Sequence, residues 1–497
     1  MKSKIVKRLL AASLATVMVT GLAACGDKKD GDNKSSEASK ESSVEASSEV
    51  ESTDDASSEV ESTEESSEEE IELRVDRDGN PLDLGGIEVI IRDWWSGDGE
   101  PKEATDAYEE ARQEYLDWAM ETYNFKIKEM TISSWGSVPE DFQNYAQSGG
   151  DEYYIFTLRA GAELTGAMNS DLMYDVSTLG VFDFSDSKWS SGVHKQYSKG
   201  DKVYGFRGIL AEPRVGVYFN KRVLEDAGLS AKQIYDWQEN GEWDWKKFEE
   251  VCATVQKDKD NDGVIDVYGM ACFSSDYYPA VVASNNGDFV RADASGKYVS
   301  ALESEETIEA LNWGLDMWTK YDASQGYPED AEWNNWVPTY QSGVACFTVG
   351  GCYQAGQEYS RDNMADDFGF VCMPKGPKAT DYTNIYDDNV YAIPACYDEE
   401  KAWKIATAYD IFTEPIPGFE DYNPQLTGYY NNFRDTESVD YTINRMCTNG
   451  RTTLHKMVSG IDLGSQLIWP LNKDNTPAQQ AEAIRSQWEA FLEEANQ

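Results

Sequence analysis

The sequence predicts an α/β protein with more than one lobe, in which the first lobe is built on a parallel sheet. Strand-like and helix-like segments alternate between residues 86 and 158, an order typical of parallel strands joined by right-handed crossovers. The chain has 497 residues, which exceeds the usual limit for a single hydrophobic core. Hydrophobic residues make up 40% of the chain and aromatic residues 12%, so the composition supplies the material for a large packed core.

The elements of this first sheet follow one another closely. In order, they are a strand at Gly86–Arg92, a turn-rich loop at Asp93–Pro101, a helix from Thr105 to Thr122, a strand at Phe125–Ile132, a helix from Pro139 to Gln147 and a strand at Tyr153–Leu158. The helices are assigned from apolar residues at helical spacing. Ligands of open parallel sheets bind where the carboxyl ends of strands meet loops. We therefore expect a site in the loops that follow these strands.

The net charge excludes one large class of partners. The chain has 91 Asp and Glu against 43 Lys and Arg, a formal net charge of −48. Nucleic-acid binding needs a basic face that neutralises phosphates, so no nucleic-acid partner is expected. The same charge disfavours adsorption to anionic lipid by electrostatics alone. Two His in the whole chain disfavour histidine-based metal or triad chemistry.

Residues 1–24 are typical of an export signal. A basic start, Met1–Arg8, precedes an apolar run that ends at Ala24 and is too short to span a bilayer stably. The run ends in Leu-Ala-Ala-Cys25, which resembles the lipobox of bacterial lipoproteins. The resemblance implies that a lipidated Cys25 anchors the mature protein to the outer face of the cell membrane, its only expected membrane contact. An ordinary signal peptide with a coincidental cysteine is the alternative.

Residues 25–72 follow as the lipidated cysteine and an acidic tether. Between residues 26 and 72 there are 18 acidic residues against 4 Lys, and the sequence from Ala46 to Thr53 repeats at Ala56–Thr63. Such a composition buries too little apolar surface to offset the entropy of ordering. We expect a disordered spacer that holds the globular part, from Leu73 onward, away from the membrane.

The remaining cysteines and the two histidines give no sign of an active site. The cysteines are Cys252, Cys272, Cys346, Cys352, Cys372, Cys396 and Cys447. Their odd number leaves at least one thiol unpaired, and we expect seven buried thiols, with a Cys346–Cys352 bridge as the alternative. Neither His194 nor His455 lies near a nucleophile signature. No catalytic residue is predicted.

Nine short segments, spread along the chain, carry a resemblance to known proteins: Gly200–Gly205, Gly216–Lys221, Leu224–Leu229, Trp243–Glu250, Asp258–Gly269, Gln341–Gly351, Phe368–Gly376, Tyr391–Pro394 and Ala402–Trp403. In their sequence and order they resemble the family 1 extracellular solute-binding proteins, the sugar-capturing components of ATP-binding-cassette (ABC) importers, and the resemblance covers most of residues 85–497. The last Gly-Gly pair is followed by Cys352 and Tyr353 where family members often carry a tryptophan. Tyr353 is therefore expected to replace the stacking platform.

The resemblance implies a type II periplasmic-binding-protein-like fold with a ligand cleft between two α/β lobes joined by hinge strands. Lobe 1 is expected at 73–208 with a returning segment near 368–390, and lobe 2 at 209–367 with helices at 391–497. The implied protein is a non-enzymatic monomer that captures a carbohydrate, an oligosaccharide in particular, and delivers it to ABC permease subunits by hinge closure. A surface-anchored glycoside hydrolase or polysaccharide lyase is the alternative.

Aromatic residues in loops are the candidate ligand contacts. Sugars present apolar C–H faces and a ring of hydroxyls, so their sites combine aromatic platforms with planar polar groups. The predicted ligand-binding residues are Trp94, Trp95, Asp151, Arg159, Arg207, Tyr277, Tyr278, Trp333, Trp336, Tyr353 and Asp388. Further candidates are Asp93, Phe206, Asp276, Asn335 and Tyr429.

An acidic loop provides a candidate calcium site. Asp258, Asp260, Asp262, Val264 and Asp266 occupy positions 1, 3, 5, 7 and 9 of an EF-hand-like loop, in which alternate residues supply hard oxygen ligands. Position 12 is Gly269, so the usual bidentate glutamate is missing. The sequence therefore predicts a structural Ca²⁺ site, with a metal-free acidic turn as the alternative.

Overall fold

The computed structural model describes residues 73–497, except 190–192, 209–212, 387–388, 421 and 474. The predicted signal, Cys25 and the acidic tether lie outside the described residues, and so does Asp388. Among the described residues, no helix is both long and apolar enough to cross a membrane.

The chain divides into two compact units. In the described part of the smaller unit, Val75 pairs with Pro81 across a turn. The Oδ1 atom of Asp76 accepts hydrogen bonds from the backbone N–H groups of Asp78 and Asn80, both at 2.9 Å. This unit also contains Ala104–Trp118, and thus the first part of helix α2 (Ala107–Tyr123).

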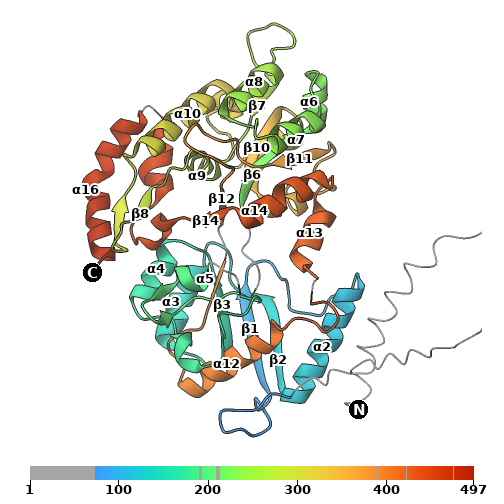
Figure 1. The fold of residues 1–497 in the computed structure, drawn as a ribbon, viewed down its shortest axis with the longest axis vertical. Coiled ribbons are helices and arrows are strands. Elements are labelled where there is room, and N and C mark those ends of the chain that lie inside the picture. Colours follow the sequence, from blue (N-terminus) through green and yellow to red (C-terminus); the bar gives the residue numbers. More distant parts are fainter. Residues whose placement is uncertain (1–72, 190–192, 209–212, 387–388, 421, 474) are drawn as a thin grey trace, which may run out of the picture. The chain divides into compact units, whose positions relative to one another are not determined.

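The larger unit contains two four-stranded sheets, of which the first carries the predicted parallel strands (Figure 1). Strand β1 (Ile87–Asp93) lies between β2 (Phe125–Thr131) and β3 (Tyr153–Leu158), and is parallel to both. Strand β13 (Val390–Ala392) pairs antiparallel with β3. The alternation of strands and helices predicted for residues 86–158 is therefore confirmed, with boundaries shifted by only a few residues.

Short helices and a small hairpin accompany the first sheet. They are α3 (Val138–Ser148), α4 (Ala162–Asn169), η1 (Val176–Leu179), α5 (Val193–Gln196), β4 (Ser198–Lys199), β5 (Lys202–Val203) and α12 (Glu399–Phe412). Helix α12 packs against both β2 and β3.

The second sheet has the order β11-β6-β10-β7. Strand β6 (Val215–Asn220) pairs antiparallel with β10 (Ala345–Gly351) and with β11 (Phe368–Val371), and β10 is parallel to β7 (Tyr268–Met270). A Cβ atom at Gly216 would lie 2.3 Å from Cζ of Phe370. Glycine at this position therefore allows the Phe370 ring of β11 to approach the backbone of β6 closely.

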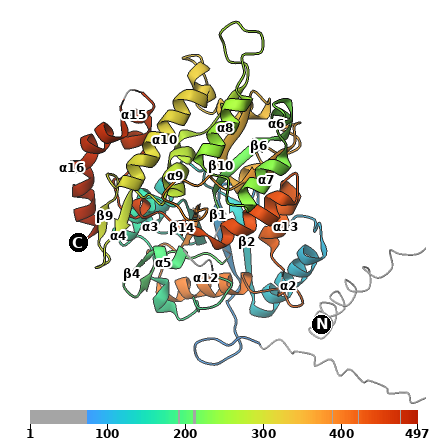
Figure 2. The same cartoon turned by 45° about the horizontal axis from the view of Figure 1, so that its top comes forward.

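Helices surround this second sheet, and α10 packs against both α9 and α16 (Figure 2). The elements of this part are α6 (Lys221–Asp226), α7 (Ala231–Glu239), α8 (Trp245–Val255), α9 (Ser274–Ser284), α10 (Glu305–Tyr321), η2 (Ala323–Gly326), α11 (Trp336–Gln341), η3 (Cys352–Gly356), α13 (Pro424–Asn432), η4 (Ser438–Ile443), α14 (Asn444–Thr448), η5 (Leu454–Met457), η6 (Gly464–Ile468), α15 (Trp469–Leu471) and α16 (Pro477–Ala495). Two small sheets pair β8 (Val290–Ala292) with β9 (Tyr298–Ser300), and β12 (Asn384–Tyr386) with β14 (Gly450–Thr452).

The chain connects the two large sheets three times along its length, after β5, after β12 and after α12. The pairings differ from the predicted lobe limits at two segments. Phe368–Val371, predicted to return to the first lobe, belongs to the second sheet. The return is instead made by β13 (Val390–Ala392), which begins at the last residue of the predicted returning segment, and by α12, which was predicted to belong with the second lobe. Short apolar strands carry no signal for which sheet they join, which explains the misplacement. The lobe limits as a whole remain a prediction.

All seven described cysteines are free thiols. Five are buried, whereas Cys396 and Cys447 are exposed, so the prediction that all seven are buried is wrong for these two. The alternative Cys346–Cys352 bridge is not formed.

Candidate ligand-binding site

The loop that follows β1 is fixed by a buried carboxylate. Asp93 is fully buried, and its Oδ1 atom accepts hydrogen bonds from the N–H groups of Trp95 at 3.1 Å and Ser96 at 3.0 Å. The Ser96 hydroxyl donates to Asp93 Oδ2. This Asx-type turn holds Trp94 and Trp95 with their ring centroids 5.0 Å apart and their planes at 85°. Trp95 is 45% exposed, so its ring is presented for contact at the carboxyl end of the sheet.

A second aromatic platform lies in the loops after β2 and β3. The Arg159 guanidinium lies 4.1 Å from the ring centroid of Trp135, and its Nη2 atom is 3.0 Å from Glu163 Oε1. Trp135 is 60% exposed. Arg159 is among the predicted site residues, but Trp135 is not. Its position four residues after the end of β2 is the signal that would have identified it.

The second sheet presents Tyr353 directly after β10. A Cβ atom at Gly351 would lie 2.5 Å from Cε1 of Tyr353, so the glycine lets the tyrosine ring lie against the backbone. The Arg214 guanidinium lies 5.2 Å from the centroid of the same ring. Gly351 at the end of β10 therefore leaves room for the Tyr353 ring.

Tyr353 and Arg207, both predicted, line one pocket of about 420 Å³. The other lining residues are Gly356, Gln357, Gln425, Gly428, Tyr429 and Asn432. Tyr429 was a loop candidate but lies on α13, where Gln425 Nε2 donates to its Oη atom at 3.1 Å. Sequence reasoning missed Gln357, Gln425 and Asn432 because surface amides in loops and helices carry no pattern.

The chemistry of this pocket suits recognition of hydroxyl groups. None of the described residues that line it is Asp, Glu, His or Cys, so the lining supplies amides, phenols and a guanidinium rather than a nucleophile or a proton-transfer pair. The Nη1 atom of Arg207 donates to the Asn389 carbonyl at 3.3 Å, and its guanidinium lies 5.9 Å from the Tyr391 ring centroid. Burial raises the pKa of Tyr391 above its ordinary value, which keeps this phenol neutral.

Three predicted contacts are buried in the core of the second sheet. Tyr277 and Tyr278 are fully buried on α9, where their hydroxyls donate to the Gly314 carbonyl at 3.1 Å and to Asn472 Oδ1 at 2.8 Å. Trp336 is 7% exposed on α11. These hydroxyl bonds hold both tyrosines in the core, so their prediction as ligand contacts is wrong. Trp336 is no more buried than the pocket residue Tyr429, which is also 7% exposed, so Trp336 stays a prediction.

The other predicted residues are at the surface. Trp333 is 77% exposed and lies 6.0 Å, centroid to centroid, from Phe273. Asp151 is exposed ahead of β3. Neither Trp333 nor Asp151 lines the pocket that Tyr353 and Arg207 share, so both stay predictions.

The predicted calcium loop brings its carboxylates together. One oxygen from each of Asp258, Asp260 and Asp262 lies within 4.8 Å of the others. Asp258 accepts hydrogen bonds from the N–H groups of Asn261 at 2.7 Å and Gly263 at 2.8 Å. Asn261 and Gly263 adopt left-handed backbone conformations, with φ of 62° and 92°. Asp266 Oδ2 instead accepts the N–H of Lys259 at 2.6 Å, and Val264 is exposed, with its backbone carbonyl as the predicted ligand.

Comparison with known proteins identifies the fold. No protein-family model matches the chain, and no curated protein matches it in sequence. Among solved structures, the cyclic α-maltosyl-1,6-maltose binding protein of Arthrobacter globiformis aligns with a TM-score of 0.57 at 15% identity, covering 82% of this chain and 100% of that one. UgpB of Mycobacterium tuberculosis, in complex with glycerophosphocholine, aligns with a TM-score of 0.57 at 14% identity, covering 78% of this chain and 95% of that one. An ABC substrate-binding protein of Listeria monocytogenes, in complex with cycloalternan, aligns with a TM-score of 0.55 at 14% identity, covering 82% of this chain and 98% of that one.

The chain has the fold of ABC substrate-binding proteins. The predicted fold class, a two-lobe α/β binding-protein fold, is therefore confirmed. At these identities the comparison establishes the fold and not the ligand, and UgpB illustrates the point because its ligand in that structure is not a sugar.

Proposed function

We propose that the protein is a solute-binding protein that captures an oligosaccharide and delivers it to the permease subunits of an ABC importer. The observation that carries the proposal is the pocket of about 420 Å³ between Tyr353 and Tyr429, with Arg207 and three side-chain amides in its lining. Aromatic faces pack against sugar C–H groups, and amides pair with hydroxyls. Three chain connections between the sheets provide hinges for closure of a monomer around the ligand.

The hydrolase or lyase alternative is not proposed, because solved structures that share this fold are named as binding proteins and not as enzymes. Glycoside hydrolysis uses two carboxyl groups on either side of the scissile bond, and the described lining of the pocket offers none. The proposed role is binding without covalent chemistry.

A thermal-shift panel tests the ligand class. A ligand that binds only the folded protein stabilises it by about 2.7 kcal/mol at a concentration 100 times its Kd. Neutral oligosaccharides should raise the Tm, whereas peptides and glycerophosphodiesters should not. A shift with glycerophosphocholine alone would refute the carbohydrate assignment and leave the transport role standing. Release of shortened glycans during incubation would refute the binding-only role.

We further propose that Cys25 is the lipid attachment site and that the protein is held on the outer face of the cell membrane. The lipobox-like sequence ending at Cys25 and the acidic tether up to residue 72 support this. Metabolic labelling with a palmitate analogue should mark the wild-type protein and not the Cys25→Ser variant. Equal labelling of both would contradict the anchor.

The acidic loop is proposed to bind a structural Ca²⁺. The three neighbouring carboxylates and the Val264 carbonyl are hard oxygen donors, the type that Ca²⁺ prefers, while the missing ligand at Gly269 calls for water in its place. Adding CaCl₂ to chelator-treated protein should raise the Tm of wild type and leave that of Asp260→Ala unchanged. An Asp293→Ala variant, changed in a different aspartate-capped turn, serves as the matched control and should respond like wild type. An identical Tm with chelator and with calcium would exclude the site.

A further inference from the structure

The segment after β14 reaches from the second-sheet side into the core of the first. Met457 is 5% exposed and belongs to a hydrophobic cluster with Phe156 and Leu158 of β3 and with Leu164 and Met168 of α4. We call these residues the first-sheet cluster. Strand β14 pairs with β12 and not with either large sheet. The packing of Met457 therefore links this segment to the first sheet without a covalent connection, in addition to the three places where the chain connects the sheets.

A buried hydrogen bond joins the same two elements. The Thr165 hydroxyl of α4 donates to the Lys456 carbonyl at 2.8 Å, and Thr165 is 1% exposed. A hydrogen bond that is shielded from water is stronger than an exposed one, and breaking it leaves an unpaired buried group. Separation of α4 from η5 therefore loses both this bond and the packing of Met457.

The segment that carries Met457 is held firmly on its own side. Arg451 Nη1 lies 3.3 Å from Asp288 Oδ2, and the His455 and Phe289 rings meet edge to face with centroids 5.5 Å apart. Met457 therefore cannot follow α4 without breaking these contacts as well.

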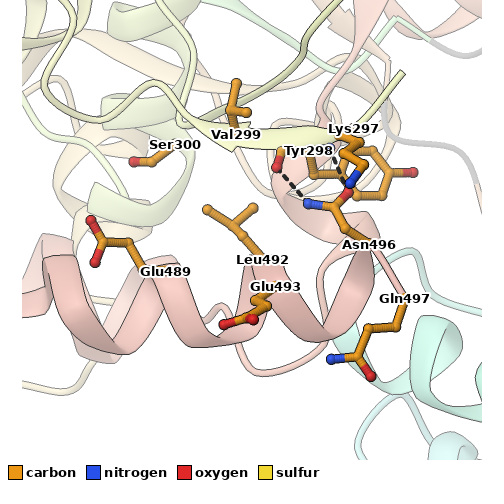
Figure 3. A pocket seen from close by; sticks show the side chains of 9 residues that line it. All are labelled: Lys297, Tyr298, Val299, Ser300, Glu489, Leu492, Glu493, Asn496 and Gln497. Atoms are coloured by element: carbon orange, nitrogen blue, oxygen red, sulfur yellow. Dashed lines mark hydrogen bonds between the residues drawn. The ribbon is translucent and has the colours of Figure 1, made fainter. Parts of the chain in front are cut away.

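A third contact comes from the β8–β9 hairpin. Tyr298 packs against the first-sheet cluster and also against the large cluster of the second sheet. Its backbone is clamped by the Asn496 carboxamide, which accepts from the Tyr298 N–H and donates to its carbonyl, both at 2.8 Å (Figure 3). Asn496 thus takes the place of a neighbouring strand at the free edge of β9 and fixes the tyrosine from the end of α16.

We propose that Thr165, Tyr298 and Met457 form an interlobe latch that stabilises the closed arrangement of the two sheets. Helix α4 begins three residues after Arg159, at the carboxyl end of β3, so the latch lies on the side of the first sheet where the site residues are. Opening for ligand entry must break it, and closure around a ligand restores it. Asn496 is the positioning residue that holds Tyr298 in the latch. The role in ligand capture rests on the proposed function, whereas the latch itself does not.

The chain contains a natural pair of reporter sites for this motion. Cys396 precedes α12, which packs on the first sheet, and Cys447 lies on α14, which contacts η4 on the second-sheet side. The other five described cysteines are buried. Spin labels on Cys396 and Cys447 in the full-length Cys25→Ser chain report the distance between the lobes by pulsed electron paramagnetic resonance, with no ligand present.

Two variants remove the latch by different means. Met457→Ala removes the buried side chain, and Thr165→Val removes only the hydroxyl. The matched controls are Met317→Ala, a fully buried methionine in the core around the second sheet, and Thr157→Val, on β3, whose buried hydroxyl makes no hydrogen bond within the described residues. Circular dichroism and the Tm report whether each variant folds.

If the latch forms, a major population of wild-type molecules should have a separation between the two labels that matches the Cys396–Cys447 distance of this structure. We call this the short separation, and that of opened molecules the long separation. In Met457→Ala the ratio of short to long separations should fall at least about tenfold. In Thr165→Val it should fall by a smaller factor, and both controls should match wild type. If Met457→Ala does not fold, Thr165→Val decides. The latch is overturned if wild type lacks the short separation, or if Thr165→Val and the controls share one distance distribution.

Discussion

The buried carboxyl group of Asp322 allows a quantitative test of how the core of the second sheet is packed. Asp322 is 1% exposed, and its two oxygens accept the N–H groups of Ser324 at 2.9 Å and Cys272 at 3.0 Å. Burial nevertheless raises the pKa of Asp322 from 3.8 to about 7. The hydrogen bonds therefore only partly offset the cost of removing the charged carboxylate from water.

The sign of the pH dependence follows from this shift. Below about pH 4 the group is protonated in both the folded and the unfolded chain, so its burial carries no charge penalty. Between about pH 4 and 7 the folded state binds more protons, and its stability falls as the pH rises. Because the pKa rises from 3.8 to about 7, the free energy of unfolding should be lower by about 4 kcal/mol at pH 8 than at pH 4.

The substitution Asp322→Asn removes the titration and keeps a carbonyl oxygen that accepts from Ser324. Urea unfolding followed by tryptophan fluorescence gives the free energy of unfolding of both proteins across about pH 4 to 8. As the pH rises from about 4 to 8, the free energy of unfolding of the variant should increase by about 4 kcal/mol relative to that of wild type. Any constant offset reflects the lost bond from Cys272 and is independent of pH. A difference that stays constant across this range would refute the assignment.

Two further predictions concern a buried ion pair and a close contact between two strands. Lys188→Met should lower the free energy of unfolding by about 3–5 kcal/mol, since it leaves Asp410, with a side chain 9% exposed, without the ammonium group at 2.8 Å. The exposed control Lys232→Met should change it by under about 1 kcal/mol, and equal effects in urea unfolding would contradict the buried pair. Gly216→Ala should destabilise by about 1–3 kcal/mol because the new Cβ would lie 2.3 Å from Phe370; an unchanged unfolding midpoint would contradict this packing.

The alternation of apolar segments was sufficient to predict the first sheet. Strand β3 begins and ends at Tyr153 and Leu158, as the sequence predicts, because it is a short apolar run between turn residues. The sheet that a later strand joins was not predictable in this way. Val390–Ala392 pairs with β3 although 231 residues separate the two strands, and nothing within three apolar residues encodes that partner.

Tyr353 was predicted from the resemblance to a family in which an aromatic residue often follows the Gly-Gly pair. In the structure its ring occupies the space that a Cβ atom at Gly351 would fill, and its contact with a ligand stays a prediction. Tyr277 and Tyr278 were misplaced because two adjacent tyrosines next to polar residues resemble a loop, whereas α9 buries both. The amides of Gln357 and Asn432 line the pocket through tertiary placement alone.

Titration calorimetry with two neighbouring tyrosines of α13 tests the central claim most directly. Tyr429 lines the pocket, whereas Tyr430 is 41% exposed and donates to Asp440 instead. The account predicts that a neutral oligosaccharide binds to wild type and to Tyr430→Ala with equal affinity. Tyr429→Ala should bind it at least about tenfold more weakly. Equal affinities for all three proteins, or no binding of any saccharide to wild type, would contradict the proposed carbohydrate site.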